Sequence, residues 1–343
     1  MRILITGGCG FIGSNLADHF LEKGHEITVL DNLSRRGTDW NKSWLEQRHR
    51  KNLKFVNGDI RDPDLVKESV KDQEMIFNTA AQVTVTDSVL NPRNDFEINA
   101  MGALNVLEAA RLSKNDPTVV YTSTNKVYGE GPNVIPLEET DTRWRYADPR
   151  FEHGVPEEFT TDCDKHGPYG NSKYAADLYT RDYAHVYGLP TVTFRQSCIY
   201  GTRQFGNEDQ GWIAHFTIMS VLGKGVNIYG DGKQVRDTLF MDDLISAFEL
   251  AVKHINSTKG KAYNMGGGHK NTISLLELLS LLEKLNGRKI GSKYFDWRPA
   301  DQKVYISDIA KAKRDFKWEP KVSPQEGIAR LHQWVEDNIS LFK

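Results

Sequence analysis

The feature that most constrains the fold is a cluster of glycines between a short apolar run and an amphipathic stretch. Thr6-Gly7-Gly8-Cys9-Gly10-Phe11-Ile12-Gly13 follows the apolar run 2–5, and apolar residues then recur at helical spacing until Gly24. Glycines allow a tight turn, close approach of a pyrophosphate and close packing of helix on strand. The pattern predicts a βαβ unit that binds a dinucleotide, with free N–H groups of the helix facing its phosphates.

Short apolar runs alternate with amphipathic stretches through the first half of the chain, as in parallel strands joined by helices. We expect strands at 2–5, 26–30, 54–57, 75–78, 119–123 and 191–194, and helices at about 96–112, 169–187, 212–222, 242–254, 274–285 and 324–338. The predicted fold class is α/β, a Rossmann doubly wound parallel sheet with a smaller C-terminal α/β substrate-binding lobe. Residues 1–195 form the predicted NAD-binding domain, with an excursion over the active site at 130–168. Residues 196–343 form the predicted substrate-binding lobe, whose chain interleaves with the first domain.

Asp31 ends the second predicted strand, where a carboxylate can bind the adenosine ribose. Its charge favours NAD over NADP, although Arg35 and Arg36 could attract a 2′-phosphate, contact adenine or substrate phosphate, or simply face solvent. Ligands of an open parallel sheet bind at the carboxyl ends of its strands, so we expect residues after the third and fourth strands to contact the dinucleotide as well. From these patterns the predicted cofactor-binding residues are Gly7, Gly10, Phe11, Ile12, Gly13, Asp31, Asn32, Ser34, Arg35, Asp59, Ile60, Ala80, Ala81 and Gln82.

Tyr169 and Lys173 are four residues apart in a predicted helix, so their side chains share one face. An ammonium beside a phenol stabilises the phenolate and brings its pKa of about 10 toward the working range of a base. Thr124 ends the fifth strand and would hold the same substrate hydroxyl. A Tyr-x-x-x-Lys pattern alone is common on exposed helices, but strand, threonine, excursion and helix in this order are specific. Thr124, Tyr169 and Lys173 are the predicted catalytic residues for moving a hydride between a sugar and a nicotinamide ring.

In these motifs the chain resembles the extended short-chain dehydrogenase/reductase (NAD-dependent epimerase/dehydratase) family, whose members act on nucleotide sugars. The resemblance covers nearly the whole chain and implies an enzyme with bound NAD. It implies that Tyr169 and Lys173 also contact the cofactor, together with Asn99, Ser123 and Cys198. It further implies that the arginines of Gly232-Lys233-Gln234-Val235-Arg236-Asp237 and Arg298-Pro299-Ala300-Asp301 grip the nucleotide diphosphate, which suits the geometry of arginine.

Asn125 and Lys126 restrict the reactions that the site can catalyse, because 4,6-dehydratases of the family carry an Asp-Glu pair, the general acid and base, at these positions. An amide cannot relay a proton as a carboxylic acid does, so such a dehydratase is disfavoured. Segments 123–129, 203–212 and 230–237 are similar to those of CDP-paratose (CDP-tyvelose) 2-epimerases. This similarity implies inversion at C2 of a CDP-hexose through a 2-keto sugar. The predicted substrate-binding residues are Asn125, Lys126, His166, Arg203, Gln204, Gln210, Arg236, Arg298 and Asp301.

Several alternatives stay open. A 4-epimerase, decarboxylase or reductase of the same family would use the same catalytic residues, and a non-catalytic sensor of NAD or nucleotide sugar would bind without turnover. His166 could be a loop residue without chemistry, and Lys126 could serve packing or hold the cofactor.

Composition excludes other classes of protein. The net charge of -2 gives no basic surplus for nucleic acid or an anionic membrane. The chain has three widely spaced cysteines, Cys9, Cys163 and Cys198, and none of them forms a Cys-x-x-Cys pair. We therefore expect neither a disulfide framework nor a metal site. A cytoplasmic location is expected, because the N-terminus lacks a long apolar stretch. Family habit adds the expectation of a homodimer or homotetramer.

Overall fold

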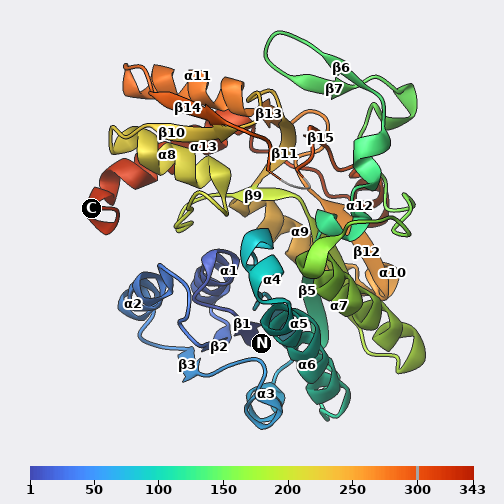
Figure 1. The fold of residues 1–343 in the computed structure, drawn as a ribbon. Helices are drawn as coiled ribbons and strands as arrows, with labels where there is room; N and C mark the ends of the chain where they lie inside the picture. Colours follow the sequence, from blue (N-terminus) through green and yellow to red (C-terminus); the bar gives the residue numbers. More distant parts are fainter. Residues whose placement is uncertain (299–300) are drawn as a thin grey trace.

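The computed structural model describes residues 1–298 and 301–343, and its core is a seven-stranded parallel sheet (Figure 1). The strand order is β12-β8-β5-β4-β1-β2-β3, and every neighbouring pair is parallel. The strands are β1 (Arg2–Thr6), β2 (Glu26–Asp31), β3 (Leu53–Asn57), β4 (Met75–Asn78), β5 (Thr118–Thr124), β8 (Thr191–Gln196) and β12 (Lys261–Met265). The order reverses between β1 and β4, which is where open α/β sheets bind ligands. The predicted Rossmann fold is confirmed.

Helices cover both faces of this sheet. Buried side chains of α1 (Phe11–Glu22), α2 (Thr38–Arg48), α9 (Met241–Lys253) and α12 (Ala310–Phe316) share one core cluster with the sheet. Those of α3 (Pro63–Val70), α6 (Gly102–Arg111) and α7 (Gly167–Val186) belong to a second cluster. Each helix buries an apolar stripe against the sheet, as amphipathic spacing dictates.

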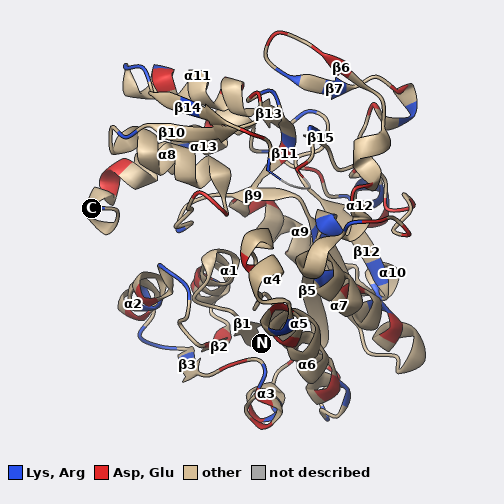
Figure 2. Cartoon of the chain, viewed as in Figure 1, with Lys and Arg blue, Asp and Glu red and all other residues tan. Residues whose placement is uncertain are grey.

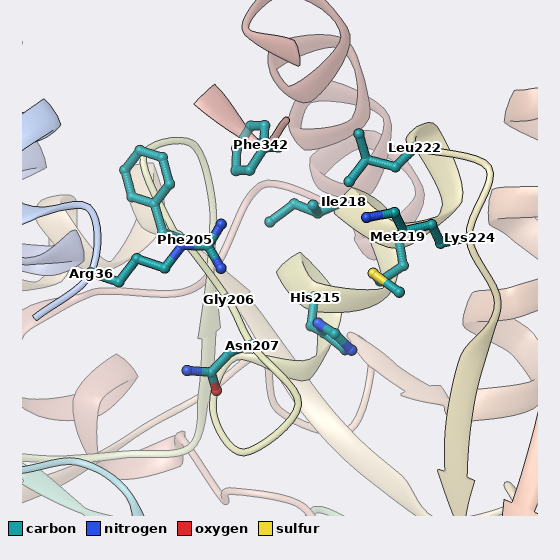
Figure 3. A pocket seen from close by; sticks show the side chains of 10 residues that line it. All are labelled: Arg36, Phe205, Gly206, Asn207, His215, Ile218, Met219, Leu222, Lys224 and Phe342. Carbon is teal, nitrogen blue, oxygen red and sulfur yellow. The ribbon is translucent and has the colours of Figure 1, made fainter. Parts of the chain in front are cut away.

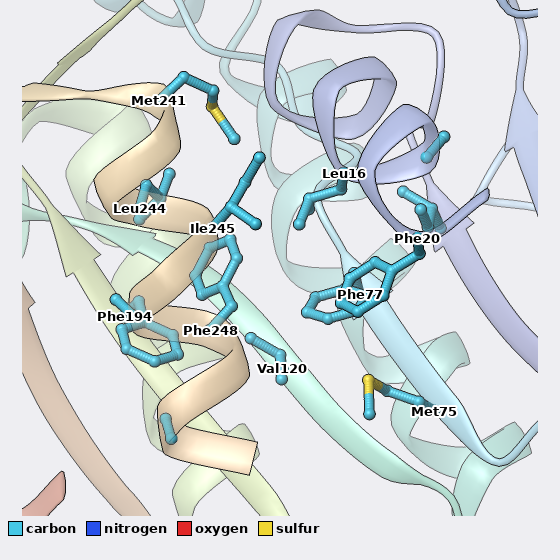
Figure 4. Close-up of a cluster of buried hydrophobic side chains, with 14 of the residues drawn as sticks. Leu16, Phe20, Met75, Phe77, Val120, Phe194, Met241, Leu244, Ile245 and Phe248 are labelled. Atoms are coloured by element: carbon cyan, nitrogen blue, oxygen red, sulfur yellow. The ribbon is translucent and has the colours of Figure 1, made fainter. Parts of the chain in front are cut away.

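An aromatic cluster joins the two halves of the chain (Figure 4). The ring centroid of Phe77 on β4 lies 5.3 Å from that of Phe20 on α1 and 5.7 Å from that of Phe248 on α9. Phe248 also packs edge-on against Phe194 of β8, at 4.8 Å. Helix α9 and strand β12 therefore belong to the central layers although both follow residue 195. The division into lobes at that residue stays a prediction.

The helix predicted at 96–112 has a more complex form. After α4 (Val85–Leu90), the chain forms α5 (Pro92–Phe96), a π-helical turn η1 (Glu97–Met101) and then α6. Asn99 lies in the π turn, where its side chain accepts a hydrogen bond from Gln82 N at 3.0 Å and donates one to Gln82 O at 3.1 Å. Asn99 thus ties the π turn to the loop that follows β4, and π turns are frequent at functional sites.

The remaining elements gather beyond the carboxyl ends of the strands, at the top of Figure 1. Strands β9 (Cys198–Tyr200), β11 (Val235–Phe240), β13 (Thr272–Ser274) and β15 (Val304–Tyr305) form one sheet, and β10 (Val226–Tyr229) pairs with β14 (Ser292–Phe295). The helices of this region are α8 (Trp212–Val221), α11 (Leu275–Asn286) and α13 (Pro324–Asp337), followed by the short η5 (Ile339–Leu341). The short α10 (Ile255–Thr258) instead packs against α9, α12 and β8 of the central layers. A capping box between Ser274 and Glu277 starts α11, and Ser323 caps α13. The helices predicted at 212–222, 242–254, 274–285 and 324–338 are confirmed as α8, α9, α11 and α13, and each end agrees to within one residue.

The excursion 130–168 docks on this second region. It contains η3 (Gly131–Val134), the hairpin of β6 (Leu137–Glu139) and β7 (Trp144–Tyr146), and η4 (Pro149–Phe151). The indole of Trp144 donates to Asp231 at 2.8 Å, and Val155 N donates to Ile306 O at 2.7 Å. These bonds fix the middle of the excursion to the elements around β11.

Acidic and basic side chains are interspersed over the ribbon (Figure 2). Within residues 1–298 and 301–343, no helix combines the length and apolar character needed to cross a membrane. The same residues include no group of three or more His, Cys, Asp or Glu side chains that could hold a metal ion.

Candidate active site

The glycine turn has the geometry that its sequence predicts. Gly7 adopts a φ of +65°, and a Cβ there would lie 2.7 Å from the Cα of Ala80. A Cβ on Gly13 would lie 2.3 Å from Gly7 O, which is a clash with the backbone of the preceding turn. Helix α1 begins after Gly10 without a side-chain cap, so its first N–H groups stay free for a ligand. These features form a cradle for a pyrophosphate.

A cleft follows this turn along the carboxyl ends of β1, β2, β3 and β4. Thirteen of the predicted cofactor residues line it, namely Gly7, Gly10, Phe11, Ile12, Gly13, Asp31, Asn32, Ser34, Arg35, Asp59, Ile60, Ala80 and Ala81. The structure thus brings together the residues that were predicted from separate strand ends, and the cleft fits a dinucleotide.

Asp31 sits at the end of β2 inside the cleft. Its carboxylate accepts hydrogen bonds from Cys9 N at 2.9 Å and Leu33 N at 2.8 Å. Burial raises the pKa of Asp31, while the two backbone N–H groups lower it. Asp59 lies at the end of β3 and accepts hydrogen bonds from Asn32 and Arg61, which hold its pKa at about 2.

Thr124 and Tyr169 meet at the carboxyl end of β5. The phenol is largely enclosed, and burial raises the pKa of Tyr169 to about 12, whereas a hydrogen bond with Thr124 lowers it. The backbone N–H of Tyr169 donates to Ser88 Oγ at 3.3 Å, which ties the start of α7 to α4. A hydroxyl and a phenol aimed at one place can hold and deprotonate a substrate alcohol.

The expected effect of Lys173 on the phenol is not found in this arrangement. Its ammonium donates to the carbonyl of Thr122 at 2.5 Å and lies 4.4 Å from the ring centroid of Tyr121. Burial lowers the pKa of Lys173 to about 7, and the charges of Asp95 and Asp177 oppose that shift. The ammonium is directed to β5, so burial and not this lysine dominates the pKa of Tyr169.

Polar groups beneath α7 position the catalytic helix. Ser172 donates to Asp95 at 2.5 Å, and Asn99 donates to Asp95 and to Ser172 at 3.1 Å each. Ser123 donates to Asp177 at 3.0 Å, so this predicted cofactor residue lies under the helix, outside the lining of the cleft. The network links α7 to both β5 and the π turn.

The predicted phosphate-binding arginines come from β11 and from the segment that follows β14. Arg236 on β11 pairs with Asp301 at 2.7 Å. Arg298 lies 4.2 Å from the ring centroid of Tyr229 and 3.4 Å from the carboxylate of Asp209. Pro299 and Ala300 of the predicted motif lie outside the described residues.

Other predicted substrate residues have different surroundings. Arg203, Gln204 and Gln210 line the cofactor cleft, and the Arg203 guanidinium packs on the ring of Trp44 at 4.1 Å. Gln210 accepts a hydrogen bond from Arg35 at 3.2 Å. His166 forms a 3.0 Å hydrogen bond with Val127 O just before α7.

Asn125 and Cys198 complete the predicted set. Asn125 accepts a hydrogen bond from the Thr124 hydroxyl at 3.4 Å, so its amide borders the catalytic hydroxyl. The sulfur of Cys198 accepts a hydrogen bond from the Trp212 indole at 3.1 Å. Burial raises the pKa of the Cys198 thiol to about 12, which keeps it neutral and unsuited to nucleophilic chemistry.

Sequence reasoning missed several residues of the cleft. Gly58 and Thr79 directly follow β3 and β4, so the rule that ligands gather at strand ends could have found them. Asn41 of α2 and Phe205 gave no such signal, because only packing brings them to the cleft.

A smaller pocket lies next to the cleft and shares Arg36 and Phe205 with it (Figure 3). Its other walls come from α8 and from Phe342 near the C-terminus. None of the predicted catalytic or substrate-binding residues lines this pocket.

The comparisons with known proteins agree with this geometry. The sequence model of the family described as GDP-mannose 4,6 dehydratase matches residues 4–331. The chain belongs to this family of NAD-dependent epimerases and dehydratases. It is 42% identical to the CDP-paratose 2-epimerase of Salmonella typhi over 342 residues, which cover 98% of this chain and 99% of that protein. The predicted family and its NAD dependence are therefore confirmed.

Solved structures of the family share the whole architecture. The UDP-glucose 4-epimerase of Thermotoga maritima, solved with UDP-glucose, has a TM-score of 0.83 and 29% identity, with 99% of this chain and all of that chain covered. The UDP-glucuronic acid 4-epimerase of Bacillus cereus, solved with UDP-glucuronic acid and NAD, has a TM-score of 0.83 and 26% identity, with coverages of 98% and 100%. The family includes both epimerases and dehydratases, so membership fixes the class of substrate, a nucleotide sugar, and leaves the reaction to the residues of the site.

Proposed function

We propose that this protein is an epimerase that inverts C2 of a CDP-activated hexose, of the paratose and tyvelose type or a CDP-glucose and CDP-mannose pair. The observation that carries the proposal is the 42% identity, over nearly all of both chains, to the Salmonella typhi CDP-paratose 2-epimerase. Asn125 and Lys126 support it, because neither residue can act as the carboxylic acid and base of a dehydratase.

The cleft at the glycine turn would hold the cofactor NAD. The free N–H groups at the start of α1 would bind its pyrophosphate, and Asp31 would accept hydrogen bonds from the adenosine ribose. When bound, NAD supplies a cationic ring that accepts a hydride from the sugar and later returns it.

The chemistry of the substrate favours oxidation at C2 itself. A 3,6-dideoxyhexose has no hydroxyl at C3 to oxidise, and a ketone at C4 would acidify C3 and C5 without affecting C2. Direct removal and return of the C2 hydrogen therefore requires the 2-keto sugar to present its opposite face before reduction.

Each catalytic residue has a defined task in this scheme. Tyr169 takes the proton of the sugar O2 hydroxyl and gives it back after the sugar has turned. Thr124 shares a hydrogen bond with this phenol and orients the same hydroxyl. Lys173 holds α7 to β5 through its bond to the Thr122 carbonyl.

The phosphates must stay bound while the hexose turns, since loss of the keto sugar would end the cycle. Arg236 and Arg298 are the proposed anchors, with Asp301 orienting Arg236. Asn125 borders the Thr124 hydroxyl, and His166 bonds to Val127 O in the adjoining turn. Both are proposed to line the hexose, while Arg203, Gln204 and Gln210 would close the cleft beside it.

An NMR assay of purified enzyme with CDP-hexoses tests the reaction. Inversion at C2 is the expected product, whereas inversion only at C4 would identify a 4-epimerase and reject the proposal. A substrate deuterated at C2 sharpens the test, because direct hydride transfer retains the label. Entry of solvent hydrogen at C2 would instead indicate deprotonation of that carbon.

We also propose that the protein forms a homodimer or homotetramer through the α6 and α7 face. Apolar side chains on these helices and the adjoining turns are 40–68% exposed, which is unusual for a solvent face. They are Met101, Leu112, Leu178, Tyr179, Val186 and Tyr187. Light scattering of the purified protein measures the oligomeric state, and a monomer would contradict the proposal.

A further inference from the structure

The short turn η2 (Asn125–Tyr128) directly follows Thr124 and helps to fix its side chain. The Thr124 hydroxyl accepts a hydrogen bond at 3.3 Å from the backbone N–H of Lys126, inside this turn. Helix α7 packs closely on the turn, because a Cβ on Gly170 would lie 3.0 Å from Lys126 O. The position of the Thr124 hydroxyl relative to Tyr169 therefore depends on what holds η2 and α7 together.

A buried ion pair links α7 to the central sheet. The guanidinium of Arg195 on β8 donates to both carboxylate oxygens of Asp177 on α7, through Nε at 2.9 Å and through Nη2 at 3.2 Å. Both side chains are buried. Two bonds of this kind fix the orientation of the guanidinium as well as its distance from the carboxylate. The pair is therefore a rigid connection between the catalytic helix and β8.

The ion pair also holds the segment that carries Thr124 on both sides. Before Thr124, the hydroxyl of Ser123 donates to Asp177 at 3.0 Å. After it, Nη1 of Arg195 donates to the phenol oxygen of Tyr128, the last residue of η2, at 3.1 Å. Thr124 thus lies between two residues that are bonded to the same ion pair.

The Tyr128 phenol extends the network to the excursion. It donates to Asn264 Oδ1 on β12 at 2.8 Å, and Asn264 Nδ2 donates to Val155 O of the excursion at 2.8 Å. Tyr128 and Asn264 are both buried. Burial raises the pKa of Tyr128 to about 12, so the phenol stays protonated and can donate this bond at neutral pH. One hydroxyl therefore joins the ion pair, the turn after Thr124 and the excursion.

We propose that Tyr128, Arg195 and Asp177 are positioning residues, which together hold the Thr124 hydroxyl at the distance from the Tyr169 phenol that proton transfer requires. The inference rests on the proposed function, because only an enzyme that uses both hydroxyls needs this distance to be fixed. The three residues act through the turn and the helix and do not themselves contact the sugar or NAD. A misplacement of about 1 Å at the reacting groups can lower a rate by about 10²-fold, so bonds away from the chemistry can control it.

Tyr128→Phe tests this role with little change in packing. The variant keeps the ring, which stacks on that of Tyr305 at 6.4 Å, and loses the oxygen that joins Arg195 to Asn264. We expect kcat to fall about tenfold, whereas KM for the nucleotide sugar and the affinity for NAD change less than about twofold. Tyr305→Phe is the matched control and should keep the wild-type kcat, because the Tyr305 phenol is buried in the same cluster but does not bond to Arg195 or Asn264.

Asp177→Asn tests the other side of the network. It removes the charge that holds Arg195 and Ser123, and kcat should fall by about tenfold or more. Arg181→Met is its control, because Arg181 forms a 2.9 Å ion pair with the same carboxylate within α7, and kcat should stay unchanged. The double variant of Asp177 and Tyr128 should lose less than the product of the two single losses, because both residues act on one turn.

Other outcomes would overturn the proposal. A wild-type kcat in Tyr128→Phe would show that its hydroxyl serves only the stability of the fold, and an equal loss in Tyr305→Phe would assign the effect to packing. Loss of NAD or nucleotide-sugar binding together with kcat would mean that the site has collapsed and not shifted. If Tyr128→Phe does not fold, Arg195→Lys gives the same comparison, since a lysine keeps the charge beside Asp177 but cannot form all three bonds.

Turnover is measured per bound NAD, at a temperature where thermal unfolding shows each variant to be folded. Inversion at C4 in place of C2 would reject the proposed reaction and leave this comparison valid, because the same two hydroxyls would begin either reaction. A wild type that converts no nucleotide sugar would reject both proposals.

Discussion

The proposed dinucleotide end and the proposed phosphate-binding end of this candidate active site are built in different ways. At the dinucleotide end, consecutive strands β1 to β4 deliver glycines, backbone N–H groups and Asp31 directly from their carboxyl ends. At the proposed phosphate-binding end, Arg236 comes from β11 and Arg298 from the segment that follows β14, and an ion pair between Arg236 and Asp301 holds these segments together.

The difference teaches which kind of change each end tolerates. A cradle made of backbone depends on the absence of side chains, so adding a methyl group should damage it. A site made of charged side chains depends on their partners, so removing a charge should damage it while the fold persists. The catalytic hydroxyls lie where the two ends meet and should be most sensitive of all.

The largest expected effect is that of Tyr169→Phe. Loss of the phenol removes the proposed acid and base and should lower turnover by about 10²–10⁴-fold, while NAD remains bound because the cleft does not include this side chain. The NMR assay and the NAD content of the purified protein measure the two results. Tyr294→Phe, at an exposed tyrosine of β14 outside the lining of the cleft, is the matched control and should keep full turnover. Undiminished turnover in the Tyr169 variant would remove this residue from the mechanism.

Gly10→Ala tests the backbone cradle. A Cβ there would lie 3.1 Å from Gly7 O and intrude on the space for the pyrophosphate, so NAD affinity should fall about tenfold, while binding of CDP stays unchanged. Titration of each ligand separates the two ends of the site. Gly291→Ala has no heavy atom within 4 Å of the added methyl and serves as the control. Equal losses of NAD and CDP binding would mean that the two ends are not independent.

The smallest effect is expected from Glu157→Gln in the excursion. Burial raises the pKa of Glu157 to about 7, and its carboxylate accepts a hydrogen bond from Asn264 N at 2.8 Å. The pKa of Glu157 is higher in the folded protein than in the unfolded chain. The protonated carboxyl therefore stabilises the folded state below about pH 4.5, and this stabilisation is lost as the pH rises to about 7.

The glutamine should therefore raise the free energy of unfolding by about 1 kcal/mol at pH 8 and change it little at pH 4.5. Chemical denaturation at both pH values measures this difference. Glu158→Gln, at the exposed neighbouring position, should show no such pH dependence. An equal increase in the free energy of unfolding at pH 4.5 would show that burial of the Glu157 charge is not the cause of the stabilisation.

Local sequence was sufficient to predict a feature of the site where a single segment determines its geometry. Spacing within a strand or helix is enough to predict three features of the site. They are the glycine turn, the position of Asp31 at the end of β2, and the location of Tyr169 and Lys173 on one helix. The missed elements depend on contacts between distant segments. Strand β12 is short and joins the sheet only beside β8, and the π turn at Asn99 forms where its side chain meets Gln82.

The sequence by itself determined the Rossmann sheet, the family and the cradle for a dinucleotide, because strand and helix periodicity and glycine conformation are local properties. Only the tertiary structure decided that Lys173 bonds to Thr122 and that Arg203 packs on Trp44. It also decided that Arg236 pairs with Asp301. These contacts depend on which charges and rings the folded chain brings together. Residue spacing along the sequence does not predict them.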